Sequence, residues 1–451
     1  MISVCLTYGE LMTQPFAAAV NDTTIGDRHL RRKTMKHAML NAVWMTLASS
    51  VQRLLPFLVI PLLTRRLGHD AFGDYMLAVA LSAIVTQIVE FGFNLTATRK
   101  AAEICERGED ATPVLAEVIG GRAVIATAVL LGLFVVRHFH PLVVEDPWLF
   151  WSSVLLGVAI GGDFRCMFYG RQSVGYLTVY AVAYSILTAL VIVVLVWARN
   201  DLWLAFAAPM LVALAFSAVS LRLLNPKWRT MTFQPSDVLA ALKDSWHSFL
   251  QRGLGQISSN ISPLIVGLFA PVAAVGYFAL AERLLRQAAL FVLNPAQSIF
   301  MPYVASQRLD NPRLATRNFL LICGLLLAGS VAASGAAFAM APALAQLFLA
   351  EATPASVAPL QILSGSPPLL VVNQFAFPLW FFLLGKQHIN SVISVGYALG
   401  FAAAIFIGAS YAGHIGACAA IILSQIALML VYISCAHVLN IAPWQRNLSA
   451  Q

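Results

Sequence analysis

The sequence predicts an all-α polytopic membrane protein with about twelve transmembrane helices, and two observations support this fold class. First, 59% of its 451 residues are hydrophobic and only 11% are charged, whereas an average soluble domain carries about 25% charged residues. Second, apolar runs of about 20 residues, enough to cross a hydrocarbon core of about 30 Å, recur from residue 41 almost to the C-terminus. Little chain remains for a soluble domain.

Residues 1–40 precede the first apolar run, and we predict them to be a disordered cytoplasmic tail. Their basic cluster, residues 28–36, follows the mild apolar patches instead of preceding them, so they lack the order of a signal peptide. A second interpretation stays open, in which translation begins at Met35, directly before the first helix.

Charged residues, prolines and glycines divide the rest of the chain into predicted spans. These are 41–63, 74–96, 114–136, 148–169, 175–198, 202–224, 246–269, 273–299, 316–338, 356–384, 390–410 and 415–437. With the N-terminus inside, the loops on the inner side hold most of the Lys and Arg residues, and the outer loops hold chiefly Arg65, Arg66, Arg137 and Arg199. The positive-inside rule therefore predicts that both termini are cytoplasmic.

A weak internal repeat indicates two halves. The stretch PLLTRRLGHDAFGDYMLA from Pro61 aligns with PLIVGLFAPVAAVGYFALA from Pro263, and each joins the first helix of a half to the second. Some transporters are built from two six-helix repeats in the same orientation, with the substrate site between the two halves. The alternative is a chance match between two apolar segments. The predicted parts are an N-terminal bundle (41–224), a cytoplasmic linker (225–245), a C-terminal bundle (246–440) and a cytoplasmic tail (441–451).

Several function classes are disfavoured by composition. The net charge of +8 follows from basic inner loops, so it does not predict nucleic-acid binding. The six cysteines lie far apart without a CxxC motif, so we predict free thiols and no metal site. We predict no cofactor, and no ATP-binding motif is present. The short external loops and the missing acidic cluster disfavour a membrane polymerase or glycosyltransferase, so the chain is not predicted to be an enzyme.

Two stretches carry a resemblance to a known family. NAVWMTLASSVQRLLPFLVIPLLTRRLGHDAFGDYMLAVALSAIVTQIVEFGFNLTATRKAA resembles the start of bacterial polysaccharide flippases of the Wzx type, which combine a Pro-Leu-Leu helix end, a Leu-Gly turn and a Phe-Gly-aromatic helix start. GYFALAERLLRQAALFVLNPAQSIFMPYVASQ is similar to the corresponding segment of their second half. Together with the helix count, the resemblance covers about residues 41–440.

The resemblance implies membership of the multidrug/oligosaccharidyl-lipid/polysaccharide exporter superfamily. It implies two six-helix bundles that form a V around a central cavity, and transport of polyprenyl-pyrophosphate-linked sugar units between the leaflets of the inner membrane. Residues 281–284 (AERL) resemble the Ala-Asp-Arg-Leu element of the related lipid II flippases. Arg283 is therefore the residue that the resemblance assigns to the cavity.

Arginines inside the predicted spans are the main candidates for substrate contacts, because a charge at the bilayer centre costs about 2.5–3.5 kcal/mol on insertion scales. Arg283 lies close to the predicted midplane of its span, and Arg53 near the middle of the first span. Arg286 and Arg252 are further candidates, although Arg286 has Glu282 four residues before it and Arg252 is near the inner end of its span. A structural role in ion pairs remains the alternative for Arg283 and Arg286, and extension of the side chain to the inner surface remains the alternative for Arg252.

Polar side chains at helical spacing accompany these arginines. Gln287 and Asn294 share a helix face with Arg283, and Gln256 and Asn260 share one with Arg252. On the second span Gln87, Glu90 and Asn94 share a face. Glu90 is the candidate site for a coupling proton or sodium ion, with pairing to Arg53 or Arg283 as the alternative.

Four further charged residues have local interpretations. Asp163 and Arg165, beside two glycines, are expected to form a local ion pair. Glu117 and Arg122 lie in the first turns of the third span, where we expect exposure at the membrane interface.

Three functional hypotheses follow. The first is a flippase for lipid-linked oligosaccharide that serves O-antigen, capsule or exopolysaccharide synthesis, because a guanidinium matches the oxygens of a pyrophosphate. The partners would be the lipid-linked glycan, membrane lipids, a polysaccharide polymerase and a chain-length regulator, with a coupling ion or the membrane potential as the drive. The second is a multidrug or cation antiporter of the same superfamily, and the third is the disfavoured membrane enzyme.

Overall fold

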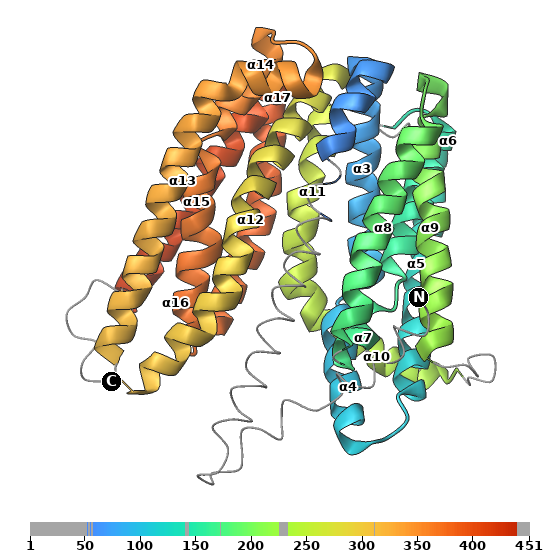
Figure 1. Ribbon diagram of the computed structural model, residues 1–451, viewed down its shortest axis with the longest axis vertical. Helices are drawn as coiled ribbons and strands as arrows, with labels where there is room; N and C mark the ends of the chain where they lie inside the picture. The colour runs from blue at the N-terminus through green and yellow to red at the C-terminus, as the bar shows by residue number, and fades with distance from the viewer. Residues whose placement is uncertain are drawn as a thin grey trace. The chain divides into compact units, whose positions relative to one another are not determined.

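The computed structural model describes residues 52, 55, 57–139, 144–171, 173–224, 233–310 and 312–439. Within these residues the chain forms helices and connecting turns, without a β-strand (Figure 1). The all-α fold class predicted from composition is therefore confirmed. The chain divides into two compact units: unit 1 is Met1–Val59 with Ser82–Gly253, and unit 2 is Ile60–Leu81 with Leu254–Gln451.

Unit 1 is built from the helices that follow the middle of α3 (His69–Glu90). Two glycines let α3 and α6 approach closely, because a Cβ at Gly157 would lie 2.7 Å from the Ser82 carbonyl oxygen and one at Gly161 would lie 2.7 Å from that of Thr86. Small residues of this kind permit helix packing in a bilayer. The helices of this unit are α4 (Phe93–Arg107), α5 (Thr112–Phe139), α6 (Pro147–Gly161), α7 (Arg165–Gly170), α8 (Val174–Leu195), η2 (Arg199–Asp201), α9 (Leu204–Leu224), α10 (Pro235–Ser248) and the π-helix η4 (Phe249–Gly253).

Unit 2 contains the first part of α3 and the helices that follow Gly253. They are α11 (Leu254–Gly267), α12 (Val272–Asp310), α13 (Pro312–Leu349), α14 (Pro354–Leu363), α15 (Ser366–Leu370), the π-helix η5 (Val371–Ala376), α16 (Phe377–Leu383) and α17 (Gln387–Val438).

The long stretch α17 is two helices joined by a sharp turn. Ala412 and Gly413 have non-helical backbone angles, and Gly413 has a φ of +56°, a left-handed conformation that glycine adopts without steric cost. The chain then folds back on itself, since a Cβ at Gly416 would lie 2.0 Å from the Gly408 carbonyl oxygen. The predicted division between spans 390–410 and 415–437 is confirmed.

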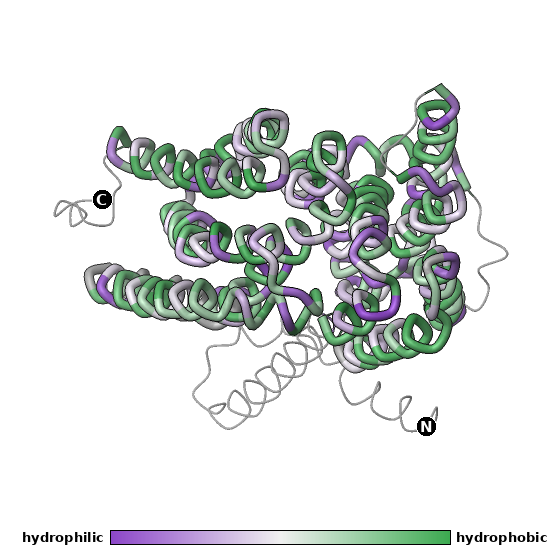
Figure 2. The backbone as a smooth tube through the Cα atoms, turned by 90° about the horizontal axis from the view of Figure 1, so that it is seen from above, coloured by the Kyte–Doolittle hydropathy of each residue, from purple (hydrophilic) through white to green (hydrophobic). Residues whose placement is uncertain are grey.

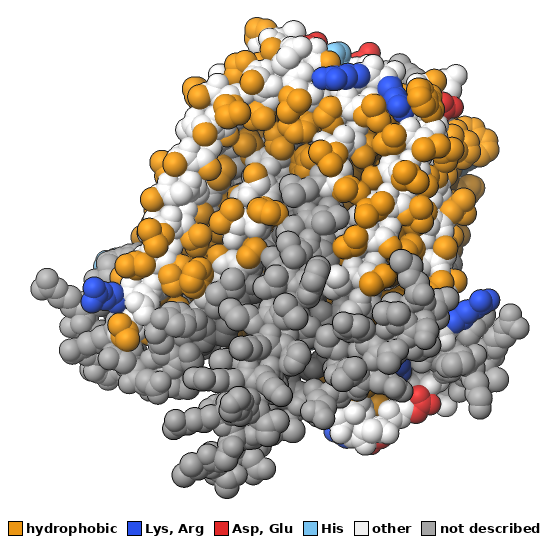
Figure 3. Space-filling model, in the orientation of Figure 1, with side chains coloured by type: hydrophobic (Ala, Val, Ile, Leu, Met, Phe, Trp, Pro, Cys, Tyr) orange, Lys and Arg blue, Asp and Glu red, His pale blue; other side chains and the backbone are white. Residues whose placement is uncertain are grey.

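The membrane character of the chain follows from helix length and hydropathy. Eight helical stretches in the described part are long and apolar enough to cross a bilayer: His69–Arg107, Thr112–Phe139, Pro147–Gly170, Gly175–Leu195, Leu204–Leu224, Leu314–Leu349, Pro354–Leu383 and His388–Val438. Hydrophobic residues predominate along these helices in Figure 2, and hydrophobic side chains cover the visible sides of the helices in Figure 3. The protein is therefore a multi-pass membrane protein, while the count of twelve spans stays a prediction.

The compact units divide the chain differently from the predicted bundles. Residues 60–81, which the bundle 41–224 includes, pack with the second unit. The predicted linker 225–245 contains most of helix α10, which packs within unit 1. The bundle boundaries and the V-shaped cavity stay predictions.

Candidate functional site

The three charges near the start of α12 lie in unit 2 and divide into a pair and a single arginine. Glu282 is 8% exposed, and its Oε1 lies 3.5 Å from Nη1 of Arg286, one helical turn further on. The same Nη1 donates a hydrogen bond of 3.0 Å to the backbone carbonyl of Ser259 on α11. The expected pairing of Arg286 with Glu282 is therefore present, and Arg286 connects α12 to α11.

Arg283 has no such partner. It is half-buried, and among the described residues its guanidinium makes neither a hydrogen bond nor an ion pair. Its electrostatic neighbours are the like-charged Arg286, then Glu282, which Arg286 already engages, and Tyr75 on α3. A partly desolvated cation without a dedicated counter-ion is costly in a membrane helix, so the position favours an anionic ligand.

The remaining candidates on α11 and α12 have differing surroundings. Gln287 and Asn294 on α12 are half-buried, and Asn294 takes part in further polar interactions. On α11, Gln256 is exposed. Asn260 donates a hydrogen bond of 2.8 Å to the backbone carbonyl oxygen of Gln256, within the same helix. The structure therefore gives these amides no common ligand cluster. Arg53 and the side chain of Arg252 lie outside the described residues.

We expect that breaking the Glu282–Arg286 pair lowers stability, because removal of one partner leaves a buried charge without compensation. Arg286→Ala should lower the free energy of unfolding by about 3 kcal/mol. The double variant Glu282→Gln/Arg286→Gln, which leaves no charge, should recover at least half of that loss. Thermal unfolding of the purified protein measures both, and equal losses in the single and double variants would contradict the pairing.

Unit 1 contains a second polar cluster, centred on Arg122 of α5, that joins four helical segments. Arg122 is only 3% exposed; its Nη1 donates to the backbone carbonyl of Asp163, and its Nη2 donates to Oδ1 of Asn94 at 3.0 Å. Nε of Arg165 donates to the carboxylate of Asp163, which is itself 3% exposed. Glu90 is half-buried at the end of α3, and its electrostatic neighbours are Arg122, Asp163 and Arg165.

The cluster confirms one prediction and corrects another. The local ion pair between Asp163 and Arg165 is present. The expectation that Arg122 is exposed at the interface is wrong, because α4 and the α6–α7 turn cover it. Glu117 instead binds Lys100, at 2.9 Å between Oε2 and Nζ. Glu90 therefore has one carboxylate, Asp163, and two guanidinium groups, Arg122 and Arg165, as neighbours, so the charges of the cluster balance.

A sequence signal for the burial of Arg122 is the pair of glycines before it. A Cβ at Gly120 would lie 2.6 Å from Val238 of α10, and one at Gly121 would lie 2.4 Å from the ring of Phe93 on α4. These close contacts bring α4 and α10 against the first turns of α5 and cover the arginine. A double glycine, Gly161 and Gly162, also precedes Asp163.

Comparison with known proteins gives matches in both sequence and fold. A family model described as "Polysaccharide biosynthesis protein" matches residues 39–307. A protein of Escherichia coli (strain K12) named "Putative O-antigen transporter" is 26% identical over 274 residues, which cover 59% of this chain and 64% of that protein. A protein of the same name from Shigella dysenteriae is 24% identical over 264 residues, 58% of this chain and 66% of that protein. Each match thus covers less than two thirds of the relative.

Solved structures share the fold at low sequence identity. The lipid II flippase MurJ in an inward closed conformation superposes with a TM-score of 0.59 and 12% identity, covering 88% of this chain and 87% of that one. An inward-facing multidrug resistance transporter of the MATE family and MOP superfamily superposes with a TM-score of 0.57 and 14% identity, covering 85% of this chain and 98% of that one. The fold is therefore that of these transporters.

Proposed function

Because this chain belongs to the family of polysaccharide biosynthesis proteins, we propose that it is a flippase for polyprenyl-pyrophosphate-linked oligosaccharides in the bacterial inner membrane. It supplies glycan units for O-antigen, capsule or exopolysaccharide synthesis and works by alternating access, with both termini in the cytoplasm. The names of the E. coli and Shigella relatives and the fold shared with a lipid II flippase support this assignment.

The observation that carries the proposal is the uncompensated charge of Arg283. Its neighbour Arg286 is neutralised by Glu282, so among the described side chains of α12 Arg283 is the arginine that remains available for an anion. A guanidinium keeps its charge at any working pH and donates two parallel hydrogen bonds to phosphate oxygens. Such charge-assisted bonds offset the loss of water from a pyrophosphate headgroup in a cavity of low dielectric constant.

The other predicted contacts extend this cationic site. Arg53 and Arg252 would add positive charge in a V-shaped cavity between two six-helix bundles. Gln256, Asn260, Gln287 and Asn294 would donate or accept hydrogen bonds from the headgroup and sugars, and Arg286 would act chiefly by holding α11 against α12. A polysaccharide polymerase and a chain-length regulator would use the delivered glycan.

Transport against a gradient needs a source of energy, and we propose two sources with equal weight. A proton or sodium ion would exchange at Glu90 with Gln87 nearby, where binding of a cation alters a cluster whose charges are otherwise balanced. A cytosol-negative membrane potential would instead push the anionic substrate outward, by about 2.3 kcal/mol per charge for 100 mV.

Reconstitution distinguishes this function from the alternatives. In proteoliposomes, we expect the protein to move a polyprenyl-pyrophosphate-linked oligosaccharide between leaflets at least tenfold faster than empty liposomes do, measured by accessibility of the glycan to an external lectin. A proton gradient, a sodium gradient and a potential are imposed separately to identify the drive. Transport of an organic cation without movement of the glycan would favour the antiporter hypothesis, and turnover of an activated sugar would favour an enzyme.

A further inference from the structure

One segment of the chain packs away from its sequence neighbours. Residues 60–81 belong to unit 2, although residues on both sides of them, up to Val59 and from Ser82, belong to unit 1. The boundary at Leu81 and Ser82 falls inside the continuous helix α3. The part of α3 before Ser82 therefore packs in unit 2, while the part from Ser82 packs in unit 1.

The first contact that holds residues 60–81 in unit 2 is a close approach of α3 to α12. A Cβ at Gly73 would lie 2.0 Å from the carbonyl oxygen of Val272, and one at Gly276 would lie 3.0 Å from the ring of Phe72. Phe72 and Leu77 are fully buried there. Moving apolar side chains from lipid into a helix contact gives little hydrophobic driving force, because acyl chains are as apolar as the side chains, so this contact depends on van der Waals packing.

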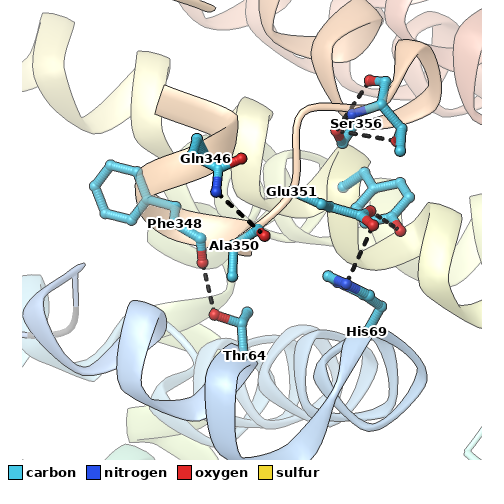
Figure 4. Close-up of polar contacts among 9 residues, drawn as sticks. Thr64, His69, Gln346, Phe348, Ala350, Glu351 and Ser356 are labelled. Atoms are coloured by element: carbon cyan, nitrogen blue, oxygen red, sulfur yellow. Dashed lines mark hydrogen bonds and ion pairs between the residues drawn. The ribbon is translucent and has the colours of Figure 1, made fainter. Parts of the chain in front are cut away.

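The second contact is polar and lies at the loop between α13 and α14 (Figure 4). Nε2 of His69 lies 3.3 Å from Oε2 of Glu351, and the hydroxyl of Tyr277 donates to the other oxygen of the same carboxylate. Five residues before His69, the Thr64 hydroxyl donates a hydrogen bond of 2.7 Å to the Phe348 carbonyl. In this loop Ala350 has a φ of +58°, a strained conformation for alanine.

Water reaches the His69–Glu351 contact, because the two side chains are 33% and 25% exposed. Both groups regain hydration when they separate, so the free-energy cost of breaking the contact is small. The glycine packing therefore fixes the geometry of the attachment, and the polar contact adds to it at a small cost of separation.

We propose that residues 60–81 are a latch, which is closed on unit 2 in this structure and parts from it during the transport cycle. The latch consists of the first part of α3 and the helical residues 60–67 that precede Gly68, and its movement carries His69 and Thr64 away from the α13–α14 loop. The inference rests on the proposed function, because it assumes that the chain works by alternating access.

A zinc bridge tests the latch. In the Glu351→His variant, His69 faces a second imidazole across a contact that now measures 3.3 Å, and Zn–N bonds of about 2.0–2.1 Å fit that span. We expect micromolar Zn²⁺ to slow glycan movement in proteoliposomes at least tenfold for this variant and EDTA to restore it. The matched controls are the wild-type protein and the double variant His69→Ala/Glu351→His, which should be unaffected.

A second measurement reports on the latch without transport. Zinc should slow hydrogen exchange of the backbone amides of residues 64–72 at least tenfold in Glu351→His, with no change in the controls. If this variant does not fold, Tyr277→His offers the same test, since the Tyr277 ring centroid lies 5.8 Å from that of His69.

The results of these experiments distinguish failure of the latch proposal from failure of the proposed function. A wild-type protein that moves no lipid-linked glycan refutes the proposed function, and slowed exchange would still support a latch that opens and closes. Undiminished glycan movement at a zinc concentration that protects residues 64–72 overturns the latch, because transport then proceeds with the segment held closed. Unchanged exchange in a variant shown to bind zinc also overturns it.

Discussion

Replacing Arg283 by alanine reduces delivery of lipid-linked glycan to the outer leaflet by about 10- to 100-fold, without a matching fall in the amount of protein in the membrane. The physical reason is that Arg283 makes no ion pair or hydrogen bond within the described residues, so its removal leaves no buried partner unsatisfied. What is lost is one or two charge-assisted hydrogen bonds to the headgroup, each contributing about 1.5–3 kcal/mol. Lectin labelling of the outer leaflet and immunoblotting of membranes measure the two quantities.

Two companion variants sharpen this result. Arg283→Lys keeps the charge but loses the planar pair of donors, so delivery should fall between the wild-type protein and Arg283→Ala. Arg53→Ala should also lower delivery if Arg53 lines the same cavity. Normal delivery with both alanine variants would rule out the cationic-cavity mechanism.

Replacing Arg122 by alanine has a different consequence, which is loss of the folded protein. The variant removes both donors that satisfy Asp163 and Asn94, and it leaves the carboxylates of Glu90 and Asp163 with Arg165 as the remaining cation of the cluster. Removal of one partner from a buried ionic cluster costs about 3–5 kcal/mol. We therefore expect membrane abundance to fall at least several-fold and the unfolding temperature in detergent to drop.

Arg99→Ala is the matched control for this prediction. Arg99 lies on α4 and pairs with Glu103, but both side chains are more than half exposed, at 68% and 55%. An exposed pair of this kind contributes about 0–1 kcal/mol, so the control should keep normal abundance. Normal abundance and stability of Arg122→Ala would show that the cluster is not structural.

Arg122 and Arg283 differ in the interaction partners that the fold gives them. Arg122 is buried with partners on neighbouring segments, whereas Arg283 is half-buried with none in the described part. The interface position predicted for Arg122 is wrong, and the cavity position predicted for Arg283 stays a prediction. Arg283 was expected to face a cavity by resemblance, and Arg122 to face the interface by its place in the first turns of a helix.

Local contacts were predictable because helix geometry determines them. Residues four apart on a helix share a face, and this spacing predicted the Glu282–Arg286 pair. Asp163 and Arg165 are two residues apart across a helix start, and their pairing was also expected. The break in α17 was predicted as the division between the apolar runs 390–410 and 415–437.

The sequence by itself therefore determined the all-helical membrane fold and the contacts within one or two helical turns. Only the tertiary structure decided which helix faces meet: Asn94 and Asp163 reach Arg122 from 28 and 41 residues away, and Thr64 reaches Phe348 from 284 residues away. The reason is that lipid is as apolar as a protein interior, so hydrophobicity marks a membrane span without marking its buried side. Helix pairing then depends on close contacts at small residues such as Gly73, Gly121 and Gly157, which become visible once both partner helices are known.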